Sequence, residues 1–369
     1  MKLTANSKCL IFMLVFVFLT SGMSWGQSRE SFVIASPQTT SQIILDKGEE
    51  LVVNTAAEVF AKDVFNVSGA LPQIVQAGSA KYQIKAGTLG VNNSFDRECR
   101  ESGIEIDALR PKWEAYCIKG KIDAANGNKI LYVVGSNPRG TAYGLMELSR
   151  MIGVSPWYWW ADVPVKKMMT LEISDNVFIE DSPSVKYRGI FLNDEGWGLW
   201  PWAKKTFDPE FGDIGPKTYE KIFELMLRLR ANHIWPAMHP NTKSFQLVAE
   251  NREVAKKFGI VVGSSHAEPL LFNNAGPEWD SRRDGPWDYN RNKNKILEVL
   301  EKQVENASAF ENIYTMGLRG IHDSKMQGID SPEEGAVLLE KIFEEQRSSG
   351  FRYWTLVVKS SGSTINYGS

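Results

Sequence analysis

The stretch Tyr314-Thr-Met-Gly-Leu-Arg-Gly-Ile-His-Asp323 begins as an apolar, strand-like segment and runs directly into a cation, an imidazole and a carboxylate. Polar groups follow apolar runs in the same way at residues 189–195, 233–239 and 260–268. A plausible helix follows each of these runs. In a (β/α)8 barrel, the loops after successive strands open on one face, where the active site is built. The pattern therefore predicts parallel barrel strands whose carboxyl ends carry a polar site.

Apolar stripes at helical spacing accompany these strands. They predict helices over residues 219–230, 245–258 and 293–305, and a further helix that begins after Ser331. Ser331 is the expected N-cap, with a proline at the first helical position and Glu334 completing a capping box. The buried face of this last helix is expected to comprise Val337, Leu338, Ile342 and Phe343. Residues 187–347 would thus contain four βα units, the first half of a barrel.

Residues 27–180 alternate β-branched runs with helical segments, which predicts a separate N-terminal α/β domain. The spacing of Thr55 and Glu58 predicts a helix N-terminus, and apolar periodicity predicts another helix over residues 141–152. Cys99 and Cys117 form either one disulfide or two buried thiols, and neither has the neighbours of a catalytic thiolate.

Composition limits the classes of protein and partner. The 369 residues are 43% hydrophobic and 23% charged, enough to bury one or two cores. The formal net charge of −2 provides no overall field for nucleic acid or an anionic membrane. Two lysines precede the apolar run 10–19, and small residues suit cleavage before Gln27, so residues 1–26 are predicted to be a signal peptide. We therefore expect an exported protein, periplasmic or secreted, without a membrane span after cleavage.

Asp323 is the first candidate for a catalytic carboxylate, because it ends the fourth strand beside His322 and four residues after Arg319. Either an acid or a base role is open, since a neighbouring arginine lowers a carboxyl pKa and burial raises it. The structural alternative is an N-cap or loop carboxylate paired with Arg319. Arg319 is equally suited to bind a uronate carboxylate through two parallel hydrogen bonds.

Asp194 and Glu195 close the first strand and are the next catalytic candidates. Adjacent strand residues point to opposite sides, so one of the two should face the site unless the strand has already ended. Asp194 is favoured for the site and Glu195 for a structural ion pair, and the reverse assignment stays open. Glu268 is a candidate on the third strand. It shares strand parity with His266, so the two side chains would point together; alternatively, Glu268 simply finishes the strand.

The remaining candidates are expected to contact sugar. The predicted substrate-binding residues are Arg319, His322, His266, His239, Trp235, Asn193 and Trp200. Aromatic faces stack on the C–H faces of sugar rings, although such tryptophans also pack loops onto a barrel. The histidines of residues 187–347 lack the paired His-x-His of zinc barrels, so no metal and no other cofactor is predicted.

Long motifs follow one another along residues 27–347, among them Tyr187-Arg-Gly-Ile-Phe-Leu-Asn-Asp-Glu195, Trp235-Pro-Ala-Met-His239, Ser264-Ser-His-Ala-Glu-Pro269 and Met316-Gly-Leu-Arg-Gly-Ile-His-Asp323. Together with residues 135–144 and 155–164, these motifs resemble glycoside hydrolase family 115. The resemblance implies an inverting α-glucuronidase that removes glucuronic acid or its 4-O-methyl ether from xylan side chains. It also implies a hexosaminidase-like N-terminal domain followed by a (β/α)8 barrel. The expected partner is xylan or a glucuronoxylo-oligosaccharide, and not nucleic acid.

The chain is expected to be truncated within the barrel. Residues 348–369 depart from the family pattern and are expected to form an aberrant or disordered tail. The alternative function is therefore a non-catalytic fragment with at most weak carbohydrate binding. A hexosaminidase-like enzyme is a third interpretation, which rests on the first domain alone and would need an acidic pair and an amide pocket not found in the sequence.

Overall fold

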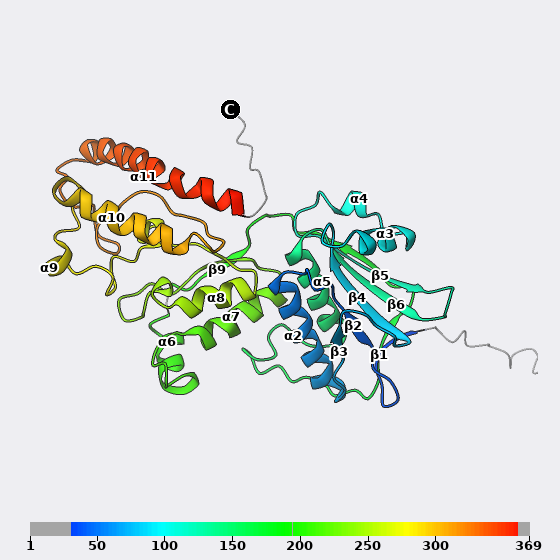
Figure 1. Cartoon of the computed structure of the whole chain (residues 1–369). Coiled ribbons are helices and arrows are strands. Elements are labelled where there is room, and N and C mark those ends of the chain that lie inside the picture. Colours follow the sequence, from blue (N-terminus) through cyan, green and yellow to red (C-terminus); the bar gives the residue numbers. More distant parts are fainter. Residues whose placement is uncertain (1–30, 194, 361–369) are drawn as a thin grey trace, which may run out of the picture.

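A computed structural model describes residues 31–193 and 195–360, with side chains up to residue 348 (Figure 1). The predicted signal peptide and Asp194 lie outside the described residues. The N-terminal half contains a six-stranded sheet, a two-stranded sheet and the helices that pack on them. The second half contains a smaller, three-stranded parallel sheet with its own helices. The mixed α/β class predicted from the sequence is confirmed.

The N-terminal half is built on a mixed sheet with the strand order β3-β2-β4-β6-β5-β8. Its strands are β2 (Gln42–Ile44), β3 (Gln73–Val75), β4 (Tyr82–Thr88), β5 (Tyr116–Ile122), β6 (Lys129–Gly135) and β8 (Phe178–Asp181). Strands β3, β2, β4 and β6 pair in parallel, and β5 joins β6 and β8 in antiparallel register. A separate antiparallel pair combines β1 (Ser31–Ala35) with β7 (Leu171–Ser174).

Helices cover both faces of this sheet. On one face, α2 (Leu51–Ser68) packs beside α5 (Pro138–Met151), and the shorter α3 (Asn93–Glu101) and α4 (Ile106–Leu109) pack with the other face. Asn137 caps α5, because its side chain accepts a hydrogen bond from the Gly140 nitrogen at 2.9 Å. A Cβ at Gly140 would lie 2.2 Å from the Ala115 carbonyl oxygen, so glycine is required for this close approach.

The second half contains a parallel sheet in the order β11-β10-β9. These strands are β9 (Gly189–Phe191), β10 (His233–Trp235) and β11 (Val261–Val262), and Val262 also forms a parallel bridge to Asn312. The principal helices are α7 (Pro216–Arg228), α8 (Ala249–Lys257), α10 (Tyr289–Ala307) and α11 (Pro332–Ser360). Short helical turns lie in the connecting loops: α6 (Leu199–Trp202), η1 (Ala203–Phe207), η2 (Phe245–Leu247), η3 (Pro269–Leu271) and α9 (Ser281–Asp284).

One hydrophobic core runs through both halves. Side chains of α2 and α5 pack in the same cluster as Phe223 of α7 and Phe258 after α8. A second cluster joins α10 to α11 through Ile296, Leu300 and Ile342, and these helices lie beside each other at the end of the molecule far from the mixed sheet (Figure 1). Burying such aliphatic side chains stabilises the fold by about 25 cal/mol per Å² of apolar surface.

Three sequence expectations differ from the structure. Thr55 lies inside α2 and its hydroxyl donates to the Leu51 carbonyl at 2.9 Å, so this helix begins before the predicted capping box. Val337 is 70% exposed, although Leu338 and Ile342 are buried as expected. Residues 348–360 continue α11, since this stretch contains no proline to end the helix, and the rest of the expected aberrant or disordered tail, residues 361–369, lies outside the described residues.

The predicted fourth strand is replaced by an irregular segment. Residues 314–323 contain no strand, and the pairing with β11 is limited to the bridge at Asn312. Gly317 has a φ of +114°, outside the extended range of a strand, and its backbone nitrogen and oxygen bond to the buried Gln346 side chain of α11 at 2.7 and 2.8 Å. The Gln346 amide thus takes the place of a neighbouring strand.

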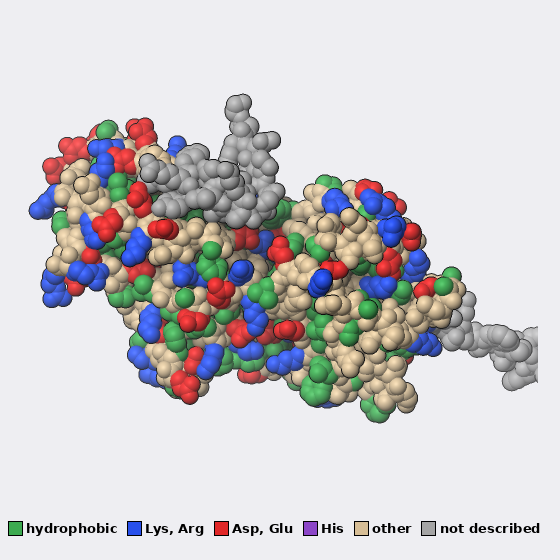
Figure 2. All heavy atoms as spheres, viewed as in Figure 1, with side chains coloured by type: hydrophobic (Ala, Val, Ile, Leu, Met, Phe, Trp, Pro, Cys, Tyr) green, Lys and Arg blue, Asp and Glu red, His purple; other side chains and the backbone are tan. Residues whose placement is uncertain are grey.

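Two surface properties bear on possible partners. Acidic and basic side chains alternate over the face shown in Figure 2 and do not gather by sign, in agreement with the small net charge. Within the part of the chain that the structure describes, none of the helices has the length and apolar character needed to cross a membrane.

Candidate functional site

The candidate site lies in the loops that follow the parallel strands. The loops after β9, β10 and β11 and the irregular segment 314–323 all leave the same edge of this sheet, since the strands run in one direction. The structure brings together there His239, His266, Arg319, His322 and Asp323, which the sequence analysis selected from separate motifs.

Asp323 is the centre of this cluster. Its Oδ1 atom lies 2.7 Å from His266 Nε2 and 3.2 Å from Arg319 Nη1, and its Oδ2 atom lies 3.5 Å from His322 Nδ1. The hydrogen bond with His266 is the main factor that lowers the pKa of the Asp323 carboxyl, and the charges of His322 and Arg319 act in the same direction. The side chain remains 60% exposed, so it is an anionic carboxylate that a ligand can reach.

Arg319 is held in place by Asp323. Besides the side-chain pair, its Nη2 atom donates to the Asp323 carbonyl oxygen at 2.9 Å. The salt bridge that the sequence analysis gave as the alternative for Arg319 is thus present. Because its side chain is 39% exposed, the guanidinium is still accessible to an anionic ligand.

Glu195 is buried beneath the site. Its Oε1 atom accepts hydrogen bonds from the Met238 and His239 nitrogens at 2.7 and 2.8 Å and so fixes the start of the loop after β10. Its Oε2 atom is buried with no hydrogen-bond partner among the described residues and lies 3.8 Å from His239 Nε2. These contacts suit a residue that positions His239.

His239 and His322 face each other, with ring centroids 5.4 Å apart. The His239 ring bonds through Nε2 to the Asn193 carbonyl oxygen. His322 has a φ of +53°, a left-handed conformation that costs energy for a residue with a side chain. Its nitrogen donates to Asn274 Oδ1 at 3.0 Å, which helps to hold this conformation. Strained backbone of this kind is often found at functional sites.

Glu268 is separated from His266. Strand β11 ends at Val262, so strand parity does not extend to these residues, and His266 is turned to Asp323. Glu268 is 4% exposed, and burial raises the pKa of its carboxyl to about 8, although hydrogen bonds from Ser265 oppose the rise. At neutral pH this side chain is therefore mainly protonated.

The two tryptophans predicted to contact sugar, Trp235 and Trp200, also contact neighbouring residues of the protein. Trp235 lies edge-to-face with Phe191 at 5.2 Å and covers Gly263, where a Cβ would come within 2.8 Å of the indole nitrogen. The Trp200 backbone nitrogen donates to the Glu195 carbonyl at 2.7 Å, and Lys204 Nζ lies 4.5 Å from the Trp200 ring centroid. Among the predicted sugar contacts, Asn193 is exposed at the mouth of the site.

The described residues contain no cluster of three or more histidine, cysteine, aspartate or glutamate side chains placed to hold a metal ion. Cys99 and Cys117 are buried free thiols in the N-terminal half. Burial raises the pKa of the Cys117 thiol to about 11, which keeps it protonated and unreactive.

Comparison with known proteins identifies the second half of the chain. Residues 180–350 match the family model described as glycosyl hydrolase family 115. This region belongs to glycoside hydrolase family 115. The resemblance drawn from the sequence motifs is thereby confirmed. A search among curated proteins found no match.

One solved structure supports the same family. A family 115 4-O-methyl-α-glucuronidase with specificity for decorated arabinogalactans is 42% identical, with a TM-score of 0.78 over 87% of this chain and 41% of that enzyme. The chain thus spans about two fifths of the length of that relative. CpGH84D covers 73% of this chain and 41% of its own at 12% identity and a TM-score of 0.42. A Streptomyces plicatus β-hexosaminidase is 10% identical, with a TM-score of 0.38 over 63% of this chain and 42% of its own. Neither of these two likenesses supports a conclusion.

Two asparagines of the family 115 region escaped the sequence analysis. Asn273 Nδ2 donates to the Met238 carbonyl at 2.8 Å, and Asn274 Nδ2 donates to the Gly320 carbonyl at 3.2 Å. Both side chains are buried and tie the loop after β11 to its neighbours on either side. The signal was present in the sequence, because two consecutive amides follow the apolar run Leu270-Leu-Phe272.

Proposed function

We propose that this chain acts in the hydrolysis of glucuronosyl or 4-O-methylglucuronosyl side chains from a decorated polysaccharide, with Asp323 as the catalytic base. The observation that carries the proposal is the exposed Asp323 carboxylate, held by His266, His322 and Arg319 where the strand ends of a family 115 region meet. A lowered pKa keeps this carboxylate ionised, as a base that activates water must be.

Inversion requires a second carboxyl group, roughly 6.5–9.5 Å from the base, that protonates the leaving oxygen. Glu195 and Glu268 are both buried, which favours supporting roles for them. We therefore retain Asp194, the candidate that the sequence analysis favoured, as the proposed acid. Inverting stereochemistry is part of the same proposal.

The surrounding cations and imidazoles suit a uronate. Arg319 supplies a planar guanidinium for the sugar carboxylate, and His266, His322 and His239 supply ring nitrogens for sugar hydroxyls. Arg319 already forms a salt bridge with Asp323 at 3.2 Å. A bound uronate would therefore compete with Asp323 for this guanidinium and weaken the salt bridge to the proposed base.

Two polymers are candidates for the substrate. Xylan follows from the motif resemblance, whereas the similar solved enzyme is specific for decorated arabinogalactans. We favour xylan and keep arabinogalactan as the second candidate. We further propose that β9, β10 and β11 are the first strands of a (β/α)8 barrel, and that the apolar run 10–19 directs export.

Release of uronic acid tests the proposal. The chain is incubated with glucuronoxylan and with glucuronosylated arabinogalactan, beside an Asp323→Asn variant and an Asp330→Asn control that changes an exposed carboxylate nearby. Loss of a general base typically costs about 10²–10⁴-fold in rate, so release should fall by at least 100-fold in Asp323→Asn alone.

Release that survives in Asp323→Asn would refute the role of this carboxylate. No release by a folded wild-type chain would instead favour the alternative function, a non-catalytic fragment with at most weak carbohydrate binding.

A further inference from the structure

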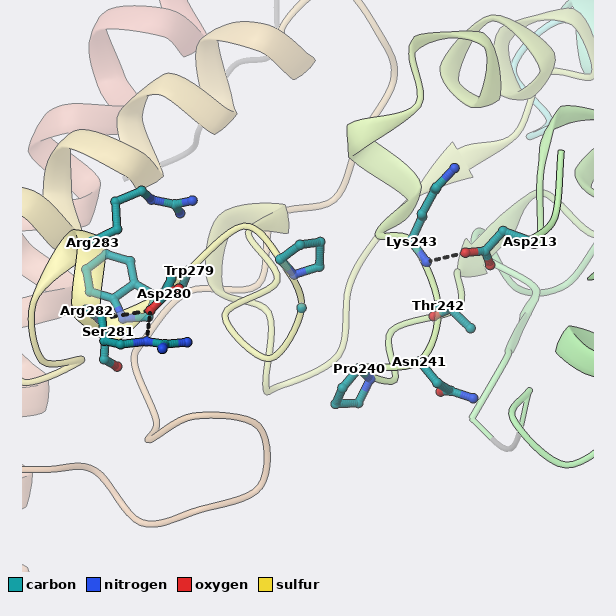
Figure 3. A pocket seen from close by; sticks show the side chains of 12 residues that line it. Asp213, Pro240, Asn241, Thr242, Lys243, Trp279, Asp280, Ser281, Arg282 and Arg283 are labelled. Atoms are coloured by element: carbon teal, nitrogen blue, oxygen red, sulfur yellow. Dashed lines mark hydrogen bonds and ion pairs between the residues drawn. The ribbon is translucent and has the colours of Figure 1, made fainter.

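An open cleft of about 720 Å³ lies beside the candidate site (Figure 3). One wall is the loop after β10, residues 240–243, and the other is the loop after β11, residues 276–283. Figure 3 shows the two walls facing each other, with Lys243 on one side and Trp279, Arg282 and Arg283 on the other. The volume falls within the range of pockets that bind small molecules.

The cleft is continuous with the site. The residue before its first wall is His239, whose carbonyl oxygen accepts hydrogen bonds from both the nitrogen and the hydroxyl of Thr242 at 2.9 Å. Asn241 lies against the loop after β9, since a Cβ on Gly196 would be 3.0 Å from its amide nitrogen. A polysaccharide bound at Asp323 can therefore extend past His239 into the cleft.

Both walls are fixed by polar contacts. The Asp213 side chain, which is 7% exposed, accepts a hydrogen bond from the backbone nitrogen of Lys243 at 3.1 Å. The Asp280 side chain caps α9 by accepting from the Arg282 nitrogen at 2.9 Å. Behind the cleft, Asn273 binds the Met238 carbonyl at 2.8 Å and accepts from the Gly276 nitrogen at 3.2 Å, so it joins the two walls.

The charge of the cleft favours an anion. Asp213 and Asp280 are both engaged by backbone nitrogens. Arg283 is paired with Asp284 at 2.6 Å, whereas Lys243, whose Nζ lies 4.5 Å from the Phe211 ring centroid, is exposed. The Arg282 side chain is 94% exposed, and its contact with Asp280 is long at 3.6 Å. Trp279 of the same wall is 6% exposed and packs against Trp287, so it supports this wall from inside. The exposed cations of the cleft suit an acidic sugar.

We propose that this cleft is a second carbohydrate subsite that binds another uronosyl-bearing unit of the same polysaccharide, away from the bond that is cleaved. Arg282 binds the carboxylate of that unit, and Lys243 on the facing wall adds positive charge to the cleft. The proposal rests on the proposed function, because it takes the same acidic polysaccharide as the ligand.

The test compares polymer binding with turnover of a short substrate. Affinity for glucuronoxylan and for the same polymer after carboxyl reduction is measured for the full chain and for the double variant Lys243→Ala, Arg282→Ala. A control variant, Lys62→Ala with Arg97→Ala, removes two exposed cations from the N-terminal half and so has the same net charge. Hydrolysis of a glucuronosyl-xylose disaccharide, which carries a single uronosyl unit and so cannot occupy both subsites, is measured in parallel.

We expect the cleft variant to bind glucuronoxylan about tenfold more weakly, as exposed charge pairs allow, and to bind the reduced polymer like the wild type. Turnover of the disaccharide should be unchanged. Equal polymer affinity of wild type and cleft variant, an equal loss in the control variant, or no polymer binding by the wild type would each overturn the subsite. Failure of the wild type to hydrolyse the disaccharide would refute the proposed function, while the binding comparison would still decide the subsite.

Discussion

At the residue scale, His266 is predicted to set the acidic limit of activity through Asp323. Its ring bonds to Asp323 Oδ1 at 2.7 Å and is the largest factor that lowers the pKa of this carboxyl. A base must be deprotonated, so activity falls as the pH drops below this pKa. In His266→Ala the pKa of Asp323 rises, and the acidic limb of kcat/KM against pH should move to higher pH. His266→Gln, which keeps a donor at this position, should shift the limb less. An unchanged limb in His266→Ala would show that Asp323 is not the group that titrates.

At the scale of helices and strands, the sequence predicted what depends on local pattern and missed what depends on contacts between distant segments. The periodicities over residues 141–152 and 219–230 correspond to α5 and α7. The same pattern could not reveal that Gln346 of α11 would bond to Gly317 and replace a strand. In the site, the polar residues after each strand were found together, because parallel strands bring their ends to one edge. The burial of Glu195 was not foreseen, since it depends on how the loop after β10 folds back over it.

A buried ion pair between α2 and α7 gives a prediction about stability at this same scale. Arg228 of α7 forms two hydrogen bonds with Asp63 of α2, at 2.7 and 2.9 Å, and both side chains are almost fully buried. Removing one partner of a buried pair leaves an uncompensated charge and costs about 3–5 kcal/mol. Asp63→Ala should lower the free energy of unfolding by roughly the lower end of that range, since Glu224 still contacts Arg228 at 2.9 Å. Urea unfolding measures the change, with Asp107→Ala as a control for an exposed pair, expected to cost less than about 1 kcal/mol. Equal losses in the two variants would contradict this account.

At the scale of the whole molecule, the N-terminal half and the family 115 region are predicted to unfold as one cooperative unit. Their hydrophobic core is continuous from α2 and α5 into α7. A buried polar cluster around Glu114 also joins the two halves. Glu114 is 0% exposed and accepts hydrogen bonds from two residues of the second half, Arg188 and Asn232, the latter at 3.0 Å. It also pairs with Arg139 of the N-terminal half at 3.3 Å. In Glu114→Ala, the two arginines lose their shared buried partner, so the whole chain should be destabilised by several kcal/mol. Hydrogen exchange in rising denaturant measures both claims. Amides of β4 and of β10 should share one midpoint in the wild type and move together in the variant. Separate midpoints for the two strands would mean that the two halves are independent domains. The buried cluster around Glu114 would then fix how the two halves are placed relative to each other without coupling their unfolding.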